Sequence, residues 1–466
     1  MTVRSTARTR AGLAALALTG LLVAATPAAA SSADGTWWYS GMGVAEANAA
    51  GATGAGVTVA VIDAGINPDL PMFAGADLHV HEPSFCFDVM TGTPYPAART
   101  DITQAAAHGS NVAGFVVGTG QGFDGATSQR GVAPEARLLF YSVGDLEKPC
   151  LATYSPVEGS PDAMALAVRQ AVDDGADIIT TSITGSMSVD PDVQAAIAWA
   201  QTEGTIVISA LSQDEAENDT ALYSGDDLAK LNGVVAVEAC DADLRPITGR
   251  DGAQMEHEKI TVCAPGVDVL VQGDERAGDW RPVRTGSGTS YAAPTVAGAL
   301  AAVWSAWPDA TANQILQTLV HDTGSEEHEL NYTADLGYGL VGLRHMLRED
   351  PARFPDENPL VHDVGDGPNV DATQITLREL AEAERPVWPG DPEWTGSTAA
   401  ATAEPDATST PAAQAPDAPS DTSGGTPVWV WGVAGLAAAA VVTAAALLAR
   451  RRSSGTAPVP AQGTDR

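Results

Sequence analysis

The sequence predicts an α/β fold: a doubly wound parallel sheet with helices on both faces, plus a single C-terminal transmembrane helix. Strand-like and helix-like runs alternate through the middle of the chain, as in successive β-α-β units. The run at 56–63 is almost continuously apolar, which is typical of a strand buried on both faces. The length of 466 residues is enough for one large α/β domain with extra segments, or for two ordinary domains.

The predicted elements follow the chain in order. Apolar runs rich in β-branched residues predict strands, and longer runs of helix formers predict helices. Strands are expected at 56–63, 137–143, 177–185, 205–210, 233–239 and 260–263. Helices are expected to begin at His108 and Ser290 and to cover 160–174, 189–202, 311–320 and 339–347.

The N-terminal part differs in composition from the body. Residues 1–30 combine arginines, an apolar core and a small-residue cleavage site, as a secretory signal peptide does. A retained anchor is the alternative. Residues 31–55 form an N-terminal extension that is too short for a domain, so we expect it to pack along the main domain, 56–350.

The C-terminal part changes composition again. Residues 351–426 are acidic and rich in Pro, Ala, Thr and Ser, which predicts a linker. Residues 427–449 include an apolar run long enough to span a bilayer, with tryptophans at one end and three arginines after the other. We therefore expect a single-pass protein of the cell membrane, its body extracytoplasmic and its short tail, 450–466, cytoplasmic.

Charge and cysteine content limit the partners. With 24 Lys and Arg against 59 Asp and Glu, the formal net charge is −35, which argues against nucleic acid as a partner. The acidity can also serve solubility alone. No metal or cofactor is predicted, because acidic side chains are too abundant to single out ligands.

The four cysteines allow three disulfide pairings, and export is compatible with disulfides. We expect Cys86–Cys150 and Cys240–Cys263, because the second pair closes one strand-loop-strand unit. Metal binding by the cysteines is the alternative, although no Cys-x-x-Cys spacing supports it.

Three polar residues stand where chemistry is expected. Asp63 directly follows a core strand, where sites in open α/β sheets form, although an acid there can also cap the next turn. His108 opens a helix of small and apolar residues, although a lone histidine is more often a surface or packing residue. Ser290 lies where a Gly- and Ser-rich loop enters a helix, although such a serine can be a plain N-cap.

Together these residues favour nucleophilic catalysis. A hydroxyl at a helix N-terminus lies beside unpaired N–H groups that stabilise negative charge. Gly286 and Gly288 would permit tight or left-handed turns there, and Pro294 would fit the first helical turn. A nucleophilic serine needs a base and the base needs an acid, and Asp, His, Ser is a known chain order for this triad.

The motifs around the three residues resemble those of subtilisin-like serine proteases, the subtilase family. They read Val61-Ile-Asp63-Ala-Gly65, His108-Gly-Ser-Asn-Val-Ala-Gly114 and Gly288-Thr-Ser290-Tyr-Ala-Ala-Pro294. The resemblance implies that Ser290 attacks the peptide carbonyl. It also implies that His108 acts as general base and then acid, and that Asp63 orients His108.

Two further assignments come from the resemblance. Ser182, Ile183, Thr184 and Gly185 match the segment that pairs with the substrate backbone, although they also fit an ordinary core strand and turn. Gln213 falls where the family has its oxyanion-binding Asn. Loss of one such donor costs about 10²–10³ in rate.

The layout of the chain resembles mycosins, the membrane-anchored subtilases of type VII secretion systems. This implies an extracytoplasmic serine endopeptidase that acts on protein or peptide substrates, with the type VII secretion machinery as a partner. The alternative is a catalytically weak or inactive scaffold subunit of a secretion complex, which the missing Asn motivates.

Overall fold

A computed structural model describes the chain over 34–88, 91–144, 150–151, 161–183, 190–212, 228–248, 259–326, 328–362, 375–389 and 391–393. The predicted signal peptide and transmembrane helix, 427–449, lie outside these residues. Within the described ranges, no helix combines the length and the apolar character needed to cross a membrane.

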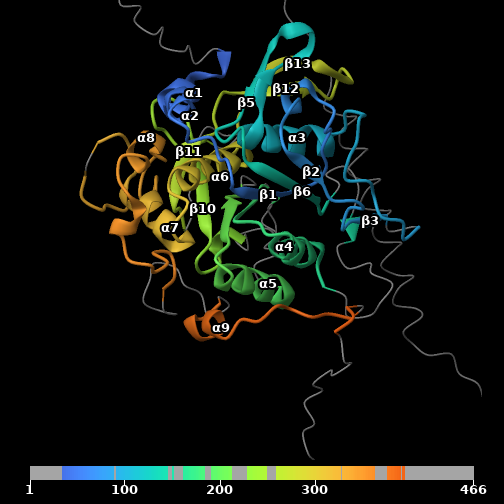
Figure 1. The fold of residues 1–466 in the computed structure, drawn as a ribbon. Coiled ribbons are helices and arrows are strands. Elements are labelled where there is room, and N and C mark those ends of the chain that lie inside the picture. Colours follow the sequence, from blue (N-terminus) through green and yellow to red (C-terminus); the bar gives the residue numbers. More distant parts are fainter. Residues whose placement is uncertain are drawn as a thin grey trace, which may run out of the picture. The chain divides into compact units, whose positions relative to one another are not determined.

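A parallel sheet of seven strands forms the centre of the fold (Figure 1), in the spatial order β11-β10-β9-β8-β1-β6-β2. The strands are β1 (Thr58–Asp63), β2 (Leu78–Val80), β6 (Arg137–Ser142), β8 (Ile178–Thr181), β9 (Ile206–Ala210), β10 (Val235–Cys240) and β11 (Val262–Pro265). Strand β1 lies between β6 and β8, so its last residue, Asp63, stands in the middle of the sheet's carboxyl edge.

Helices cover both faces of this sheet. α3 (Gln104–Val117) and α6 (Thr289–Ala306) pack on one face, and α4 (Ala163–Asp173) and α5 (Pro191–Thr202) on the other. Side chains of β1 alternate between the two cores: Val59 and Val61 face α3 and α6, whereas Ile62 faces α4 and α5. The doubly wound α/β prediction is therefore confirmed.

The remaining elements lie outside the sheet. Antiparallel pairs join β3 (Phe87–Asp88) to β7 (Cys150–Leu151), β4 (Thr119–Gln121) to β5 (Thr127–Arg130), and β12 (Val269–Asp274) to β13 (Asp279–Gly286). Further helices are α1 (Trp37–Gly41), α2 (Val44–Ala49), α7 (Ala312–His321), α8 (Leu343–Met346) and α9 (Leu377–Ala381). Single 3-10 turns occur at η2 (Pro71–Phe73), η3 (Phe123–Gly125), η4 (Leu228–Lys230) and η5 (Pro351–Arg353).

The helix predicted over 339–347 is wrong for most of its length, because only α8 is helical. Gly339 has a φ of +130°, outside the helical region. A Cβ at Gly342 would lie 2.2 Å from the Gly324 carbonyl oxygen. Cys263 N donates to the Gly339 carbonyl and Val341 N donates to the Cys263 carbonyl, both at 2.9 Å, so these backbone groups pair with β11 and not within a helix.

The N-terminal extension packs along the domain, as predicted. The Trp38 ring is 4% exposed and lies 5.6 Å from the ring of Phe115 in α3, centroid to centroid. The Trp37 indole N–H donates to the Val267 carbonyl at 3.2 Å. The extension has no core of its own, and these two tryptophans fix it on the surface of the main domain.

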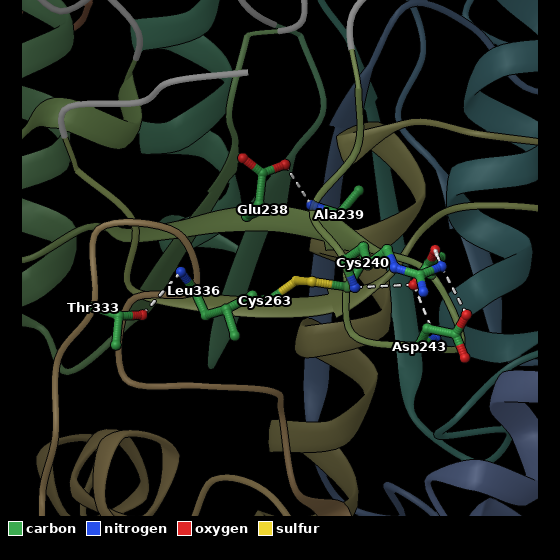
Figure 2. Close-up of a disulfide and its surroundings, with 9 residues drawn as sticks. Glu238, Ala239, Cys240, Asp243, Cys263, Thr333 and Leu336 are labelled. Carbon is green, nitrogen blue, oxygen red and sulfur yellow. Dashed lines mark hydrogen bonds and ion pairs between the residues drawn. A yellow bond between two sulfur atoms is a disulfide. The ribbon is translucent and has the colours of Figure 1, made fainter. Parts of the chain in front are cut away.

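The predicted pairing Cys240–Cys263 is confirmed. This disulfide joins the neighbouring strands β10 and β11 (Figure 2), with 6.0 Å between the two Cα atoms. Cys86 is disulfide-bonded too. The side chain of Cys150, the other half of the predicted second pair, lies outside the described part of the structure.

Part of the segment predicted as a linker packs onto α4 and α5. Trp388 is 7% exposed, and the Arg169 guanidinium lies 4.4 Å from its ring centroid. Arg169 also pairs with Asp391, and Arg385 pairs with Asp173 at 2.6 Å. We call 375–393 the C-terminal strap.

We expect Trp388→Ala to lower the free energy of unfolding by about 3 kcal/mol, because it removes a buried ring and leaves a cavity under the strap. Leu377→Ala, at a side chain that is 39% exposed on the same strap, should cost under about 0.5 kcal/mol. Urea denaturation of both variants checks this. Equal and small losses would mean that the strap does not stabilise the domain.

Candidate active site

The first component of the site is the carboxylate of Asp63, which is 0% exposed. Its Oδ1 accepts hydrogen bonds from the Ala64 backbone N–H at 2.7 Å and from His108 Nδ1 at 2.8 Å. Among the described residues, Oδ2 has no hydrogen-bond partner. Because a carboxylate is costly to bury without partners, the bonds from Ala64 N and His108 compensate for the burial of Asp63.

The second component, His108, lies in the second turn of α3. The prediction that it opens the helix is wrong: α3 begins at Gln104, and the Thr103 side chain caps it by accepting from Ala106 N at 3.1 Å. A threonine cap followed by strong helix formers starts the helix one turn earlier.

Gly109 lets α3 approach the end of β1. A Cβ there would lie 2.2 Å from the Gly65 carbonyl oxygen and 3.1 Å from Asp63 Oδ1. Any larger residue would push the helix away from the strand. The contact between Asp63 and His108 therefore depends on this glycine.

The environment of His108 favours its protonated form. Burial of the ring disfavours the imidazolium and so lowers its pKa. Attraction to the Asp63 carboxylate, the hydrogen bond to it and the charge of Glu275 together outweigh burial, so the pKa of His108 is raised above its usual 6.5. Asp63 and Glu275 thus hold the ring where a positive charge on it is stabilised.

The third component, Ser290, is the second residue of α6, so its predicted place at a helix N-terminus is confirmed. The Thr289 hydroxyl donates to the Leu211 carbonyl, just after β9, at 2.7 Å. The Ser182 hydroxyl, just after β8, donates to the Ser290 carbonyl at 2.9 Å. Since β8 is the neighbour of β1, Ser290 lies at the same edge of the sheet as Asp63 and His108.

In the part of the chain that the structure describes, no hydrogen bond joins His108 to Ser290, and both residues are half-buried. Catalytic hydrogen bonds are often long in a free enzyme and shorten only in the complex with substrate. What the fold provides is the shared sheet edge and the bond between Asp63 and His108.

Two expectations about the serine loop are wrong. Pro294 lies inside α6, beyond its first turn, where its missing N–H leaves the Ser290 carbonyl without its helical partner. The Ser182 hydroxyl takes that place. Gly286 and Gly288 are not left-handed: Gly288 is extended, with a φ of 173°, and a Cβ at Gly286 would lie 3.1 Å from Val271.

The other predicted site residues are only partly described. Ser182 contacts Ser290 as above, and Ile183 N donates to the Thr181 hydroxyl at 3.2 Å. Thr184, Gly185 and Gln213, the predicted oxyanion donor, lie outside the described residues. Within the described ranges, no three His, Cys, Asp or Glu side chains are grouped to hold a metal ion.

Two residues near the site had no signal that sequence reasoning could use. Glu275 follows β12 and acts on His108 through space, and Tyr291 packs its ring 5.5 Å from that of Phe115. Both relations depend on tertiary structure, because the partners are far apart along the chain. The β12–β13 hairpin is what brings Glu275 to the histidine.

Comparisons with known proteins agree with this geometry. A protein-family model described as the Subtilase family matches residues 54–339, which include Asp63, His108 and Ser290. Subtilisin DY of Bacillus licheniformis is 30% identical over 301 residues, covering 63% of this chain and 92% of that protein. Mycosin-1 of Mycobacterium tuberculosis is 29% identical over 362 residues, covering 70% and 76%.

Among solved structures, the crystal structure of fervidolysin from Fervidobacterium pennivorans matches with a TM-score of 0.52 and 23% identity, over 72% of this chain and 48% of that one. At this identity the likeness concerns the fold alone. In sequence, the match spans 43% of fervidolysin and 59% of Mycosin-4, so the chain covers only part of these two relatives.

We expect the His108 imidazole to titrate above pH 6.5, with the midpoint lowered in Glu275→Gln because a charge that favours the imidazolium is removed. Histidine resonances followed by NMR against pH give both midpoints. The shift should shrink at high salt, since Glu275 is partly exposed.

Glu46→Gln is the matched control, because Glu46 is also a surface carboxylate near an arginine, Arg344, at 3.4 Å. It should leave the His108 midpoint unchanged. Equal shifts in the two variants would show that Glu275 has no specific effect on His108.

Proposed function

Because the chain belongs to the subtilase family, whose members are serine endopeptidases, we propose that it is a membrane-anchored extracytoplasmic endopeptidase with Asp63, His108 and Ser290 as its catalytic triad. The observation that carries the proposal is the 2.8 Å hydrogen bond between Asp63 and His108, at the sheet edge where α6 presents Ser290. Protein or peptide chains are the substrates.

In the proposed reaction, Ser290 Oγ attacks the peptide carbonyl while His108 Nε2 takes the hydroxyl proton. Asp63 holds Nδ1 by its hydrogen bond and stabilises the imidazolium that forms. His108 then protonates the leaving amine, which leaves an acyl-enzyme on Ser290. Water, activated by the neutral His108, hydrolyses the ester and restores the serine.

The oxyanion of the tetrahedral intermediate needs hydrogen-bond donors. The start of α6 supplies backbone N–H groups without helical acceptors and the positive end of the helix dipole. We assign the second donor to the Gln213 side-chain amide. Residues 182–185 would pair with the substrate backbone as an added strand, next to the carbonyl of Ser290.

The sequence supports the location. A signal peptide at 1–30, an extension at 31–55, a catalytic domain at 56–350, a linker at 351–426, a membrane helix at 427–449 and a cytoplasmic tail at 450–466 would place the active site outside the cell membrane. The similarity to Mycosin-1 and Mycosin-4 suggests the type VII secretion machinery as a partner.

A second candidate is a scaffold subunit with weak or no catalysis. The observation that favours it is Gln213 at the position of the oxyanion Asn. The two candidates differ in whether the serine reacts at a useful rate.

A fluorophosphonate probe should label the wild-type protein, because it phosphonylates an activated serine. Ser290→Ala should abolish labelling. Ser287→Ala, in the same loop, should retain it, since Ser287 is exposed and contacts Asp268 N at 3.0 Å. Equal labelling of wild-type protein and Ser290→Ala would rule out Ser290 as the nucleophile.

Substitution of Gln213 tests whether its amide is an oxyanion donor. If the Gln213 amide binds the oxyanion, Gln213→Ala should lower kcat by about 10²–10³ with little change in KM, and Gln213→Asn should retain or raise it. Steady-state assays on a peptide substrate measure both. An unchanged kcat in Gln213→Ala would exclude this residue as the donor.

A further inference from the structure

We propose that Asn111 is a positioning residue that ties the helix of the base, α3, to the hairpin that leads to the nucleophile. The inference rests on the proposed function, because it concerns the distance between His108 and Ser290. Asn111 touches none of the reacting atoms, so its effect is on geometry.

The Asn111 side chain binds both backbone groups of one residue. It lies in α3 one turn after His108 and is 3% exposed. Its Oδ1 accepts from Gln272 N at 2.7 Å, and its Nδ2 donates to the Gln272 carbonyl at 3.0 Å and to the Ala107 carbonyl at 2.7 Å. An inverted amide would place like groups against like, so these contacts fix its orientation.

Gln272 in turn holds the hairpin together. It lies in β12 and is 2% exposed. Its side chain accepts from the Ser128 hydroxyl at 2.6 Å and donates to carbonyls of β13, including that of Arg281 at 3.1 Å. A displacement of the Gln272 backbone would therefore move both strands of the hairpin.

The hairpin continues into the serine helix. Strand β13 ends at Gly286 and α6 begins at Thr289, with Gly288 N donating to the Gly266 carbonyl at 2.7 Å. At the other end of the hairpin, the Trp280 indole donates to the Thr100 carbonyl, just before α3, at 2.8 Å. The hairpin is thus held at two points, just before the start of α3 and at Asn111 within α3.

This link matters because Asp63 fixes the ring of His108 but not its distance from Ser290. The fold leaves that distance to the packing of α3 against the hairpin and α6. A misplacement of about 1 Å between reacting groups can cost about 10² in rate. Asn111 provides directional contacts across this interface, which apolar packing alone does not.

Asn232 offers a control with the same contacts elsewhere. It is 2% exposed, accepts from His362 N at 3.0 Å and donates to the carbonyls of His362 at 2.8 Å and Ile375 at 3.1 Å. It precedes β10 and so lies at the opposite, amino edge of the sheet. Replacing it removes an equivalent set of buried hydrogen bonds far from the site.

The experiment compares Asn111→Ala and Asn232→Ala in the full chain. Both should lose stability to a similar extent in urea denaturation. Only Asn111→Ala should slow fluorophosphonate labelling of the folded protein, by roughly 10- to 100-fold, with kcat reduced in proportion and KM nearly unchanged. The His108 midpoint followed by NMR should stay above pH 6.5, because the bond to Asp63 is intact, and any fall should not exceed that of Glu275→Gln, because only the distance to Glu275 on the hairpin changes.

If Asn111→Ala does not fold, Asn111→Ser serves instead, because its hydroxyl can still donate to the Ala107 carbonyl but is too short to bond both backbone groups of Gln272. Folded Asn111 variants that label at the wild-type rate, or slow labelling in Asn232→Ala as well, would overturn the inference. Absence of labelling in the wild-type protein would instead overturn the proposed function, and the inference with it.

Discussion

The hydrogen bond between the buried carboxylate of Asp63 and the ring of His108 is the interaction on which the site depends. A buried carboxylate is stable only when hydrogen-bond partners replace water, and here the partners are the Ala64 N–H and the imidazole. The same bond also acts on His108, because the carboxylate stabilises a positive charge on the ring. Strand β1 and helix α3 must meet closely for this, and Gly109 permits it.

The fold brings the third residue to the same place by separate means. Parallel strands end at one edge of the sheet, so the segments after β8 and β9 both reach the start of α6. There Ser182 bonds to the Ser290 carbonyl and the Leu211 carbonyl accepts from Thr289. Pro294 leaves the Ser290 carbonyl free for Ser182. The β12–β13 hairpin links α3 to α6: Asn111 and the Trp280 indole tie it to α3 and to the segment before α3, and β13 leads into α6. Precision at the site thus comes from polar contacts between elements, on a core of apolar packing.

Local signals in the sequence were enough for the sheet and for the three site residues. Strands buried on both faces are apolar throughout. Asp63 ends a strand and Ser290 begins a helix, and in a parallel α/β sheet both positions lie at the carboxyl edge. Helix α3 begins earlier than predicted because Thr103 caps it one turn before His108. The helix predicted over 339–347 is mostly absent because the backbone of Gly339 and Val341 pairs with Cys263. Glu275, Asn111 and the strap could not be foreseen, since their partners are set by tertiary packing.

A double-mutant cycle shows whether Asp63, His108 and Ser290 act as one catalytic unit. The loss of kcat is measured for His108→Ala, for Ser290→Ala and for the double variant on one peptide substrate. Residues that act in a single mechanism give losses that do not multiply. If the three residues act together, the double variant will be about as slow as either single variant, whereas a loss equal to the product of the two single losses would show that they act independently.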